Sequence, residues 1–347
     1  MVDLLAARND LEHRLHAELG LRIARWTEIA AGRNNRLFRL DTVGGPSLLG
    51  KFYGRDPWGG LAREYALLSF LGARGFPGVP RAMLRSDAPA YAVYSFEPGT
   101  PKRPQDYTTA DLRNVAAFAA ALHTIASEAD ESAIRPSIEV CFSLADQLAC
   151  IDRRLGGFAA FAASPAAPAA IRALNLRDEI TRLIARATSD LEPGDLGRAI
   201  PRPAWRLNTA DFGPHNILIA ADGGITVVDC EWGGWDDPAR MVMGFVAHNG
   251  SEGLSDDGIA AFLGGYAAER ALSAAEIARF ERVGVLYDIE WVAVCASGLT
   301  PESVAIAEFA VDNFDVQAHR AEVIARIEAR LARARAGTGY RFPANPS

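Results

Sequence analysis

Lysine is almost absent from this chain. Of its 36 basic residues only two are lysines, Lys51 and Lys102, so arginine supplies nearly every positive charge. The lysine ammonium is a compact, strongly hydrated point charge, whereas the arginine guanidinium is a wide planar fork, so the two are not interchangeable at a tight site. Each lysine of such a chain is therefore a candidate for a role that arginine cannot fill.

Cysteine is scarce as well. The four cysteines (Cys141, Cys150, Cys230 and Cys295) lack the spacing of metal ligands and lie among apolar residues. This usage is typical of buried free thiols in a reducing compartment and gives little support to disulfides. We therefore expect a cytoplasmic protein with free cysteines.

Long apolar runs are missing too. No stretch approaches the roughly 18 apolar residues that a membrane-spanning helix needs, and the acid-containing first residues do not resemble a secretory signal. The formal net charge of −7 argues against nucleic acid as the main partner, because phosphate binding needs a basic surface. This charge would suit a cationic small molecule, although a charge that only keeps the protein soluble is the simpler explanation.

The 347 residues, 49% of them hydrophobic, are enough for two lobes with separate cores. The pattern predicts a small mixed lobe through residue 97, and after Thr109 the chain becomes helical and rich in alanine. The predicted elements include a helix at 3–19, strands between 26 and 53, a helix at 61–74, strands near 81–84 and 91–96, a proline-induced loop or break at 156–170, and helices at 274–298 and 302–336. The sequence thus predicts an α+β fold with lobes at 1–97 and 98–347.

The stretch from Asn208 to Glu231 contains the strongest local signal. Two apolar runs, 217–219 and 225–228, flank Asp222-Gly223, a dipeptide typical of a tight two-residue hairpin turn. In that register Asn216 lies directly opposite Asp229, and directly opposed side chains share one face. An amide oxygen and a carboxylate at the open end of a hairpin are hard ligands suited to Mg²⁺.

Asp211 precedes Asn216 by five residues, on a loop bent by Gly213 and Pro214, so it can reach the same space. There it could accept the proton of an incoming hydroxyl or orient that hydroxyl. An Asx turn would also account for an aspartate at position 211 without any catalytic role. The joint placement of Asp211, Asn216 and Asp229 favours a catalytic role instead. Glu231 could contact metal or substrate or be an ordinary loop carboxylate, and we interpret His215 as a loop-packing residue rather than a base.

Lys51 lies on a predicted strand, and Glu64 follows it by thirteen residues in a predicted helix. This spacing predicts an ion pair between strand and helix, in which the lysine would hold phosphate oxygens and the glutamate would orient the lysine. A surface lysine and a glutamate favoured by the helix dipole are the alternative. The scarcity of lysine favours the functional interpretation.

Together these residues resemble the aminoglycoside phosphotransferase family, a kinase-like group that is also similar to choline and homoserine kinases. The matching segments occur in the family's order between about residues 31 and 266: Gly32 to Leu40, Lys51, Glu64, Tyr94 to Gly99, Asp211 to Asn216, and Asp229 through Asp237-Pro238. The resemblance implies a protein-kinase-like two-lobed fold, with a small antiparallel-sheet lobe and a larger helical lobe. It also implies ATP and Mg²⁺ as cofactors and a small-molecule acceptor.

By this resemblance Asp211 is the catalytic aspartate, Asn216 and Asp229 are Mg²⁺ ligands, and Lys51, paired with Glu64, binds the phosphates.

The nucleotide would also meet the polar turn ending at Asn35, and its adenine would meet backbone groups near Ser95 and Phe96. The turn has no GxGxxG pattern, so any cover over the phosphates would be built differently. The helices after about residue 240 and the insertion at 129–205 would shape the acceptor pocket.

Two positions depart from the family pattern. The family usually has a histidine two residues before the catalytic aspartate, where this chain has Thr209, whose hydroxyl could partly replace the histidine's bracing role. The chain also has Arg240-Met241 where another acidic residue is common.

From the resemblance as a whole we predict an ATP-dependent kinase acting on a hydroxyl or amine of a small molecule. A pseudokinase that only binds nucleotide or a partner is the alternative, and the acceptor (aminoglycoside, amino-alcohol, sugar or other) stays open.

Overall fold

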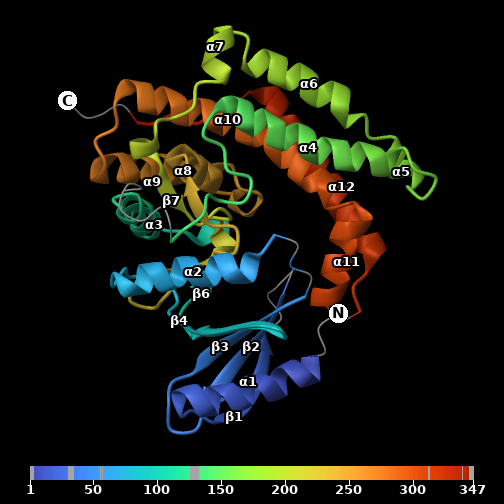
Figure 1. Ribbon diagram of the computed structural model, residues 1–347. Helices are drawn as coiled ribbons and strands as arrows, with labels where there is room; N and C mark the ends of the chain where they lie inside the picture. Colours follow the sequence, from blue (N-terminus) through green and yellow to red (C-terminus); the bar gives the residue numbers. More distant parts are fainter. Residues whose placement is uncertain are drawn as a thin grey trace.

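The computed structural model describes residues 4–29, 35–54, 56, 58–125, 133–311, 313–337 and 339–343. It shows two lobes, a small one built around a sheet and a larger one that is mostly helical (Figure 1). This architecture confirms the predicted α+β class. The exact division at residue 97 stays a prediction.

The small lobe is built on a five-stranded antiparallel sheet in the order β1-β2-β3-β5-β4. Its elements are α1 (Leu4–Leu19), β1 (Ile23–Ile29), β2 (Asn35–Thr42), β3 (Leu48–Tyr53), α2 (Gly60–Ala73), β4 (Ala82–Asp87) and β5 (Ala90–Ser95). Helix α1 lies on the outer side of the sheet, and α2 lies between the sheet and the helical lobe (Figure 1).

The two faces of this sheet belong to different cores because side chains alternate along a strand. Phe52, Tyr91 and Val93 pack with α1 in a separate small core. Their neighbours Tyr53 and Ala92 instead join the main core, which is shared with α2 and the helical lobe. Lys51 has the same parity as Tyr53, so β3 directs the lysine toward the interface between the lobes.

The large lobe is organised around one long helix, α10, which contacts α4, α6, α8 and α12. Its helices are α3 (Thr109–Leu122), α4 (Leu144–Ala162), α5 (Ala169–Arg172), α6 (Leu176–Ala187), α7 (Pro193–Leu196), α8 (Pro238–Ala247), α9 (Asp256–Glu269), α10 (Ala274–Ser297), α11 (Pro301–Ala310) and α12 (Val316–Ala336). Helix α11 reaches back to the small lobe, where the ring of Phe309 lies directly against Gly54, leaving no room for a side chain at that position.

Two predicted boundaries in this lobe are wrong. The break expected over 156–170 begins only after Ala162, since α4 continues through its glycines and ends before Pro165. The single helix predicted over 302–336 is two helices, α11 and α12. The carboxylate of Asp315 accepts hydrogen bonds from the backbone of Gln317 and Ala318, and this cap starts a new helix where the helical periodicity suggested continuation.

Short strands of the large lobe frame the loops that hold the candidate site. Strand β8 (Ile217–Ile219) pairs with β9 (Ile225–Val227) and with β6 (Thr100–Pro101), while β7 (Arg206–Asn208) pairs with β10 (Gly234–Asp236). The chain between β7 and β8 includes a single 3-10 turn, η3 (Pro214–Asn216), and a second one, η4 (Asn249–Ser251), follows α8.

The β8–β9 hairpin forms, but its predicted register is wrong by one residue. Ile217 pairs with Val227, so the loop contains three residues, 221–223, instead of two. The amide of Gly223 donates to the carbonyl of Ala220 at 3.0 Å, and Gly223 itself is left-handed with φ 85°. A turn followed by a left-handed glycine is the usual three-residue hairpin loop. Asn216 therefore pairs with Val228, not with Asp229, through a 2.9 Å backbone hydrogen bond.

The four cysteines are free and buried, as predicted. Among the described residues no single helix is long and apolar enough to cross a membrane, although α10 and α11 together meet that test across a 74° bend.

We expect Gly234→Ala to destabilise the protein by about 1–3 kcal/mol, because its Cβ would lie 2.2 Å from the carbonyl oxygen of Arg135, a backbone atom that cannot rotate away. Gly157→Ala is the matched control: this helical glycine has open space around it, so alanine should stabilise by about 0.5–1 kcal/mol. Urea denaturation measures both changes, and an unchanged stability for Gly234→Ala would contradict the close packing.

Candidate active site

Lys51 is the centre of a buried charge cluster. Its ammonium Nζ donates to Glu64 Oε2 at 2.7 Å and to Asp229 Oδ1 at 2.6 Å, and lies 3.3 Å from Glu231 Oε2. The lysine comes from β3, Glu64 from α2, and the other two acids from the segment after β9. The predicted ion pair between strand and helix is confirmed, and the lysine also binds two acids of the large lobe.

Glu64 uses both carboxylate oxygens. Oε2 accepts from Lys51 and from the hydroxyl of Tyr53, and Oε1 accepts from the backbone amide of Cys230 at 3.0 Å. The Tyr53 hydroxyl also lies 3.1 Å from that of Tyr94. Because Glu64 is only 3% exposed, these contacts fix its carboxylate in place and tie α2 to the large lobe.

The three carboxylates outnumber the single ammonium. Burial alone would lower the pKa of Lys51, but Asp229, Glu64 and Glu231 outweigh it and hold that pKa well above its ordinary value. Burial also raises the pKa of Glu231, against the opposing effect of Lys51. A cluster with surplus negative charge is a place where a divalent cation would bind favourably.

The donor set fits a hard cation. Oxygens of Glu64, Asp229 and Glu231 lie within 4.8 Å of one another, and carboxylate oxygens are the ligands that Mg²⁺ prefers. Asp229 has a left-handed backbone, φ 61°, which is unusual for an aspartate, and its side chain is 40% exposed. The cluster is therefore open on the Asp229 side.

A second cluster surrounds Asp211, on the loop between β7 and β8. Oδ1 faces Nε2 of His248 at 3.0 Å, and Oδ2 faces Nε2 of His215 and Nδ2 of Asn216, both at 3.2 Å. The Asn216 amide also donates to the backbone carbonyl of Asp211 at 3.0 Å. Burial opposes ionisation of Asp211, but the hydrogen bonds from His215 and His248 hold its pKa below the usual range.

The sequence did not predict His248. It follows α8, 37 residues after Asp211, and no local pattern links the two. The expectation that Thr209 would take over the bracing role is wrong, since its buried hydroxyl makes no hydrogen bond within the described part of the chain. His215, interpreted as a packing residue, does contact the Asp211 carboxylate.

Asn216 belongs to the Asp211 cluster and Asp229 to the Lys51 cluster. A backbone hydrogen bond connects the two segments that carry them. The amide nitrogen of Asn216 is committed to Asp211, so its amide oxygen is the atom it would offer a cation. Asp229 directly follows Val228, whose amide donates to the Asn216 carbonyl. The two residues are thus brought close through a different pairing from the predicted one, and their role as metal ligands stays a prediction.

The remaining predicted residues lie nearby. Asn35, at the start of β2, donates from Nδ2 to Glu231 Oε2 at 2.7 Å. At the end of β5, Ser95 Oγ accepts from the amide of Arg81 and donates to Glu97. In the linker that follows, the Arg39 guanidinium lies 4.8 Å above the ring of Phe96. Nucleotide contact by these residues stays a prediction. Most of the Gly32 turn lies outside the described residues.

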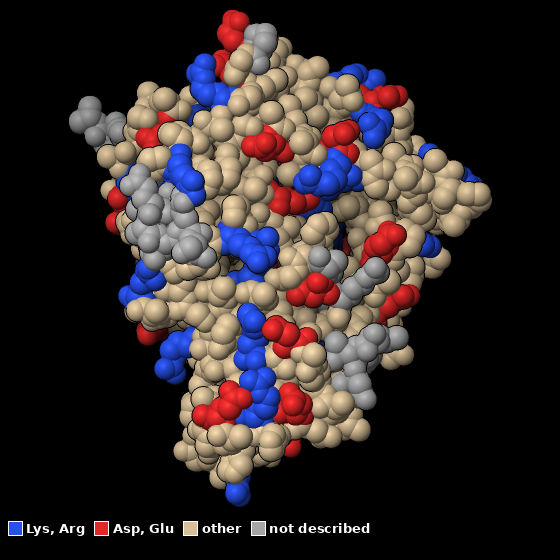
Figure 2. All heavy atoms as spheres, viewed as in Figure 1, with Lys and Arg blue, Asp and Glu red and all other residues tan. Residues whose placement is uncertain are grey.

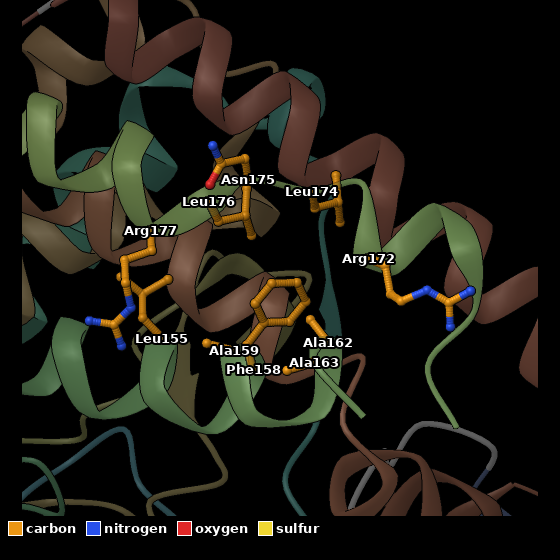
Figure 3. Close-up of a pocket in the computed structure, with 10 residues that line it drawn as sticks. All are labelled: Leu155, Phe158, Ala159, Ala162, Ala163, Arg172, Leu174, Asn175, Leu176 and Arg177. Carbon is orange, nitrogen blue, oxygen red and sulfur yellow. The ribbon is translucent and has the colours of Figure 1, made fainter. Parts of the chain in front are cut away.

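One cavity is lined by residues that belong to neither cluster. It measures about 240 Å³ and is lined mainly by apolar residues of α4 and of the chain around α5 and α6, such as Leu155, Phe158 and Leu174 (Figure 3). On the face seen in Figure 2, acidic and basic side chains are interspersed. This cavity contains none of the residues predicted to take part in chemistry.

Comparison with known proteins agrees with this fold and assigns the chain to a family. The phosphotransferase enzyme family matches residues 25–275, and the chain belongs to that family. No curated protein gives a significant sequence match.

Solved structures show the same fold at low identity. A choline/ethanolamine kinase family protein from Mesorhizobium loti is 16% identical, with a TM-score of 0.61 over 95% of this chain and 98% of its own. Spectinomycin phosphotransferase, solved with ADP and spectinomycin, is 14% identical, with a TM-score of 0.63 over 95% and 98%. Amicoumacin kinase, solved with AMP-PNP and Ca²⁺, is 14% identical, with a TM-score of 0.62 over 99% and 98%. The predicted kinase-like two-lobed fold is confirmed.

The two lysines allow a matched test of the buried cluster. Lys51→Met should lower the free energy of unfolding by roughly 3–5 kcal/mol, because it leaves buried carboxylates without their cation. Lys102→Met removes a 2.7 Å ion pair with Asp111 in which the lysine is 31% exposed, so about 1 kcal/mol or less is expected. Urea denaturation of both variants measures the difference.

Adding Glu64→Gln to Lys51→Met should recover part of the loss, since fewer buried charges then lack a partner. Equal losses for the two lysine variants would show that the cluster does not stabilise the fold.

Proposed function

We propose that this protein is an ATP-dependent phosphotransferase that moves the γ-phosphate to a hydroxyl, or an amine, of a small molecule with the help of Mg²⁺. The observation that carries the proposal is the pairing of two clusters. One is a buried lysine held by carboxylates from both lobes, and the other is an aspartate whose carboxylate is 43% exposed and held by hydrogen bonds. Membership of the phosphotransferase enzyme family supports the same reaction class.

Lys51 would bind oxygens of the non-transferred phosphates. Glu64, fixed at both oxygens, keeps the ammonium aimed, and the lysine can exchange its contact with the half-exposed Asp229 for a phosphate oxygen. A cation held by Asp229 and Asn216, with Glu231 close by, would neutralise the charge of the phosphates. These groups act by position and charge, which is what phosphoryl transfer needs.

Asp211 would receive the acceptor. The acceptor hydroxyl donates its proton to a carboxylate oxygen of Asp211, its oxygen bonds to the γ-phosphorus, and the bond from that phosphorus to the ADP oxygen breaks. The lowered pKa of Asp211 keeps the carboxylate ionised and ready to accept the hydrogen bond. With such a weak base, orienting the hydroxyl is the larger part of its role.

The acceptor is a small molecule whose identity these residues do not specify. Related folds come from proteins described as choline/ethanolamine, spectinomycin and amicoumacin kinases, which differ widely in acceptor. The free, buried cysteines support a cytoplasmic enzyme. A pseudokinase is less favoured, because the histidine missing at Thr209 has a counterpart in His248 beside Asp211.

ATP consumption with Mg²⁺ and a library of amino-alcohols, sugars and antibiotics tests the proposal. We expect turnover with at least one acceptor and a loss of about 10³-fold in Asp211→Asn, with AMP-PNP binding retained. Asp222→Asn is the matched control, since Asp222 lies in the exposed hairpin loop and should leave turnover unchanged. Tight Mg·ATP binding without turnover on any acceptor would instead identify a nucleotide-binding module.

A further inference from the structure

His248 is the buried partner of Asp211. The residue is only 7% exposed, and its Nε2 lies 3.0 Å from Asp211 Oδ1. His215, the other imidazole at this carboxylate, is half exposed and lies at 3.2 Å. The two histidines therefore differ in how firmly the structure holds them.

The other ring nitrogen of His248 determines its protonation. The backbone amide of Gly250 donates to Nδ1 at 2.8 Å. A backbone N–H can only donate, so Nδ1 must carry a lone pair, and the proton of a neutral imidazole then resides on Nε2. Nε2–H in turn donates to Asp211. The imidazolium form has no acceptor nitrogen and would lose the bond from Gly250, and burial likewise lowers the pKa of His248.

The ring is enclosed on several sides. A side chain at Gly213 would meet it at 2.6 Å, so this glycine lets the Asp211 loop lie directly on the imidazole. Trp291 packs edge-on at 4.5 Å, and His215 stacks at 5.0 Å. Arg330, which is fully buried, donates to the carbonyl of Ala247, the residue before His248. These contacts leave the imidazole little freedom to rotate.

We propose that His248 is a positioning residue that holds Asp211 in its reactive orientation and takes the place of the histidine missing at Thr209. The inference rests on the proposed phosphotransferase function. Oδ1 is then permanently occupied by a neutral N–H donor. Oδ2, which also accepts from the Asn216 amide, would meet the acceptor hydroxyl, and that hydroxyl would displace the longer contact from the exposed His215.

Kinetics with any acceptor that the wild-type enzyme turns over test the role. We expect His248→Ala to lower kcat about 10²-fold, the scale of a misplaced catalytic group, while KM changes less than about threefold because the acceptor does not touch His248. His248→Gln should recover about tenfold of that loss, since its terminal amide N–H can reach the place of Nε2–H. His123→Ala is the matched control, because His123 is equally buried but bonds to Tyr266 in the α3–α9 contact; its kcat should stay within threefold.

The tautomer is measured independently by long-range ¹H–¹⁵N NMR of the full-length protein at pH 7. The signal that disappears in His248→Gln should have the shifts of a neutral imidazole protonated at Nε2.

Four results would overturn the inference: an Nδ1–H or imidazolium signal for His248, an unchanged kcat in His248→Ala, a change confined to KM, or an equal loss of kcat in His123→Ala. If the wild-type protein turns over no acceptor, the proposed function fails instead. In that case the NMR signal, together with the melting temperatures of His248→Ala and His248→Gln, still decides whether His248 donates to Asp211. A missing Nε2–H signal, or a glutamine variant no more stable than the alanine variant, would rule that out.

Discussion

A single buried ammonium joins the two lobes. Lys51 takes its carboxylate partners from a helix of the small lobe and from the segment after β9 in the large lobe. Neither lobe could bury its share of this charge alone without a high desolvation cost. The positions of β3, α2 and the loop after β9 are therefore fixed relative to one another by the need to surround this ammonium with carboxylates.

The second cluster depends on loops instead of on regular elements. Asp211 lies on a loop, and the groups that hold it come from η3 and from the end of α8. One backbone bond, from Val228 to the carbonyl of Asn216, ties this loop to the segment that carries Asp229. That bond connects the aspartate cluster to the lysine cluster, and the proposed transfer between two substrates would require such a defined spacing.

Much of this arrangement could be read from the sequence, where the signal was local or compositional. The rarity of lysine singled out Lys51, and its spacing to Glu64 predicted their ion pair correctly. The hairpin register failed because two loop types share the Asp-Gly signal. The two-residue type I′ loop needs a left-handed backbone at both Asp222 and Gly223, and here only Gly223 of the two is left-handed. His248 was missed because its contact with Asp211 depends on how α8 packs against the loop. The division of the 302–336 helix was missed because periodicity continued across the cap at Asp315.

The contact between Phe309 and Gly54 has a mechanical consequence. Gly54 follows β3, the strand that carries Lys51, and Phe309 belongs to a C-terminal helix, so this contact spans the lobes at a point remote in sequence from the linker around Gly99. This packed ring adds a contact between the lobes to those made by the covalent linker and by the Lys51 cluster. A hinge rotation between the lobes would have to separate the ring from the glycine or carry α11 along with the sheet. Any hinge motion between the lobes would therefore involve α11 as well as the linker.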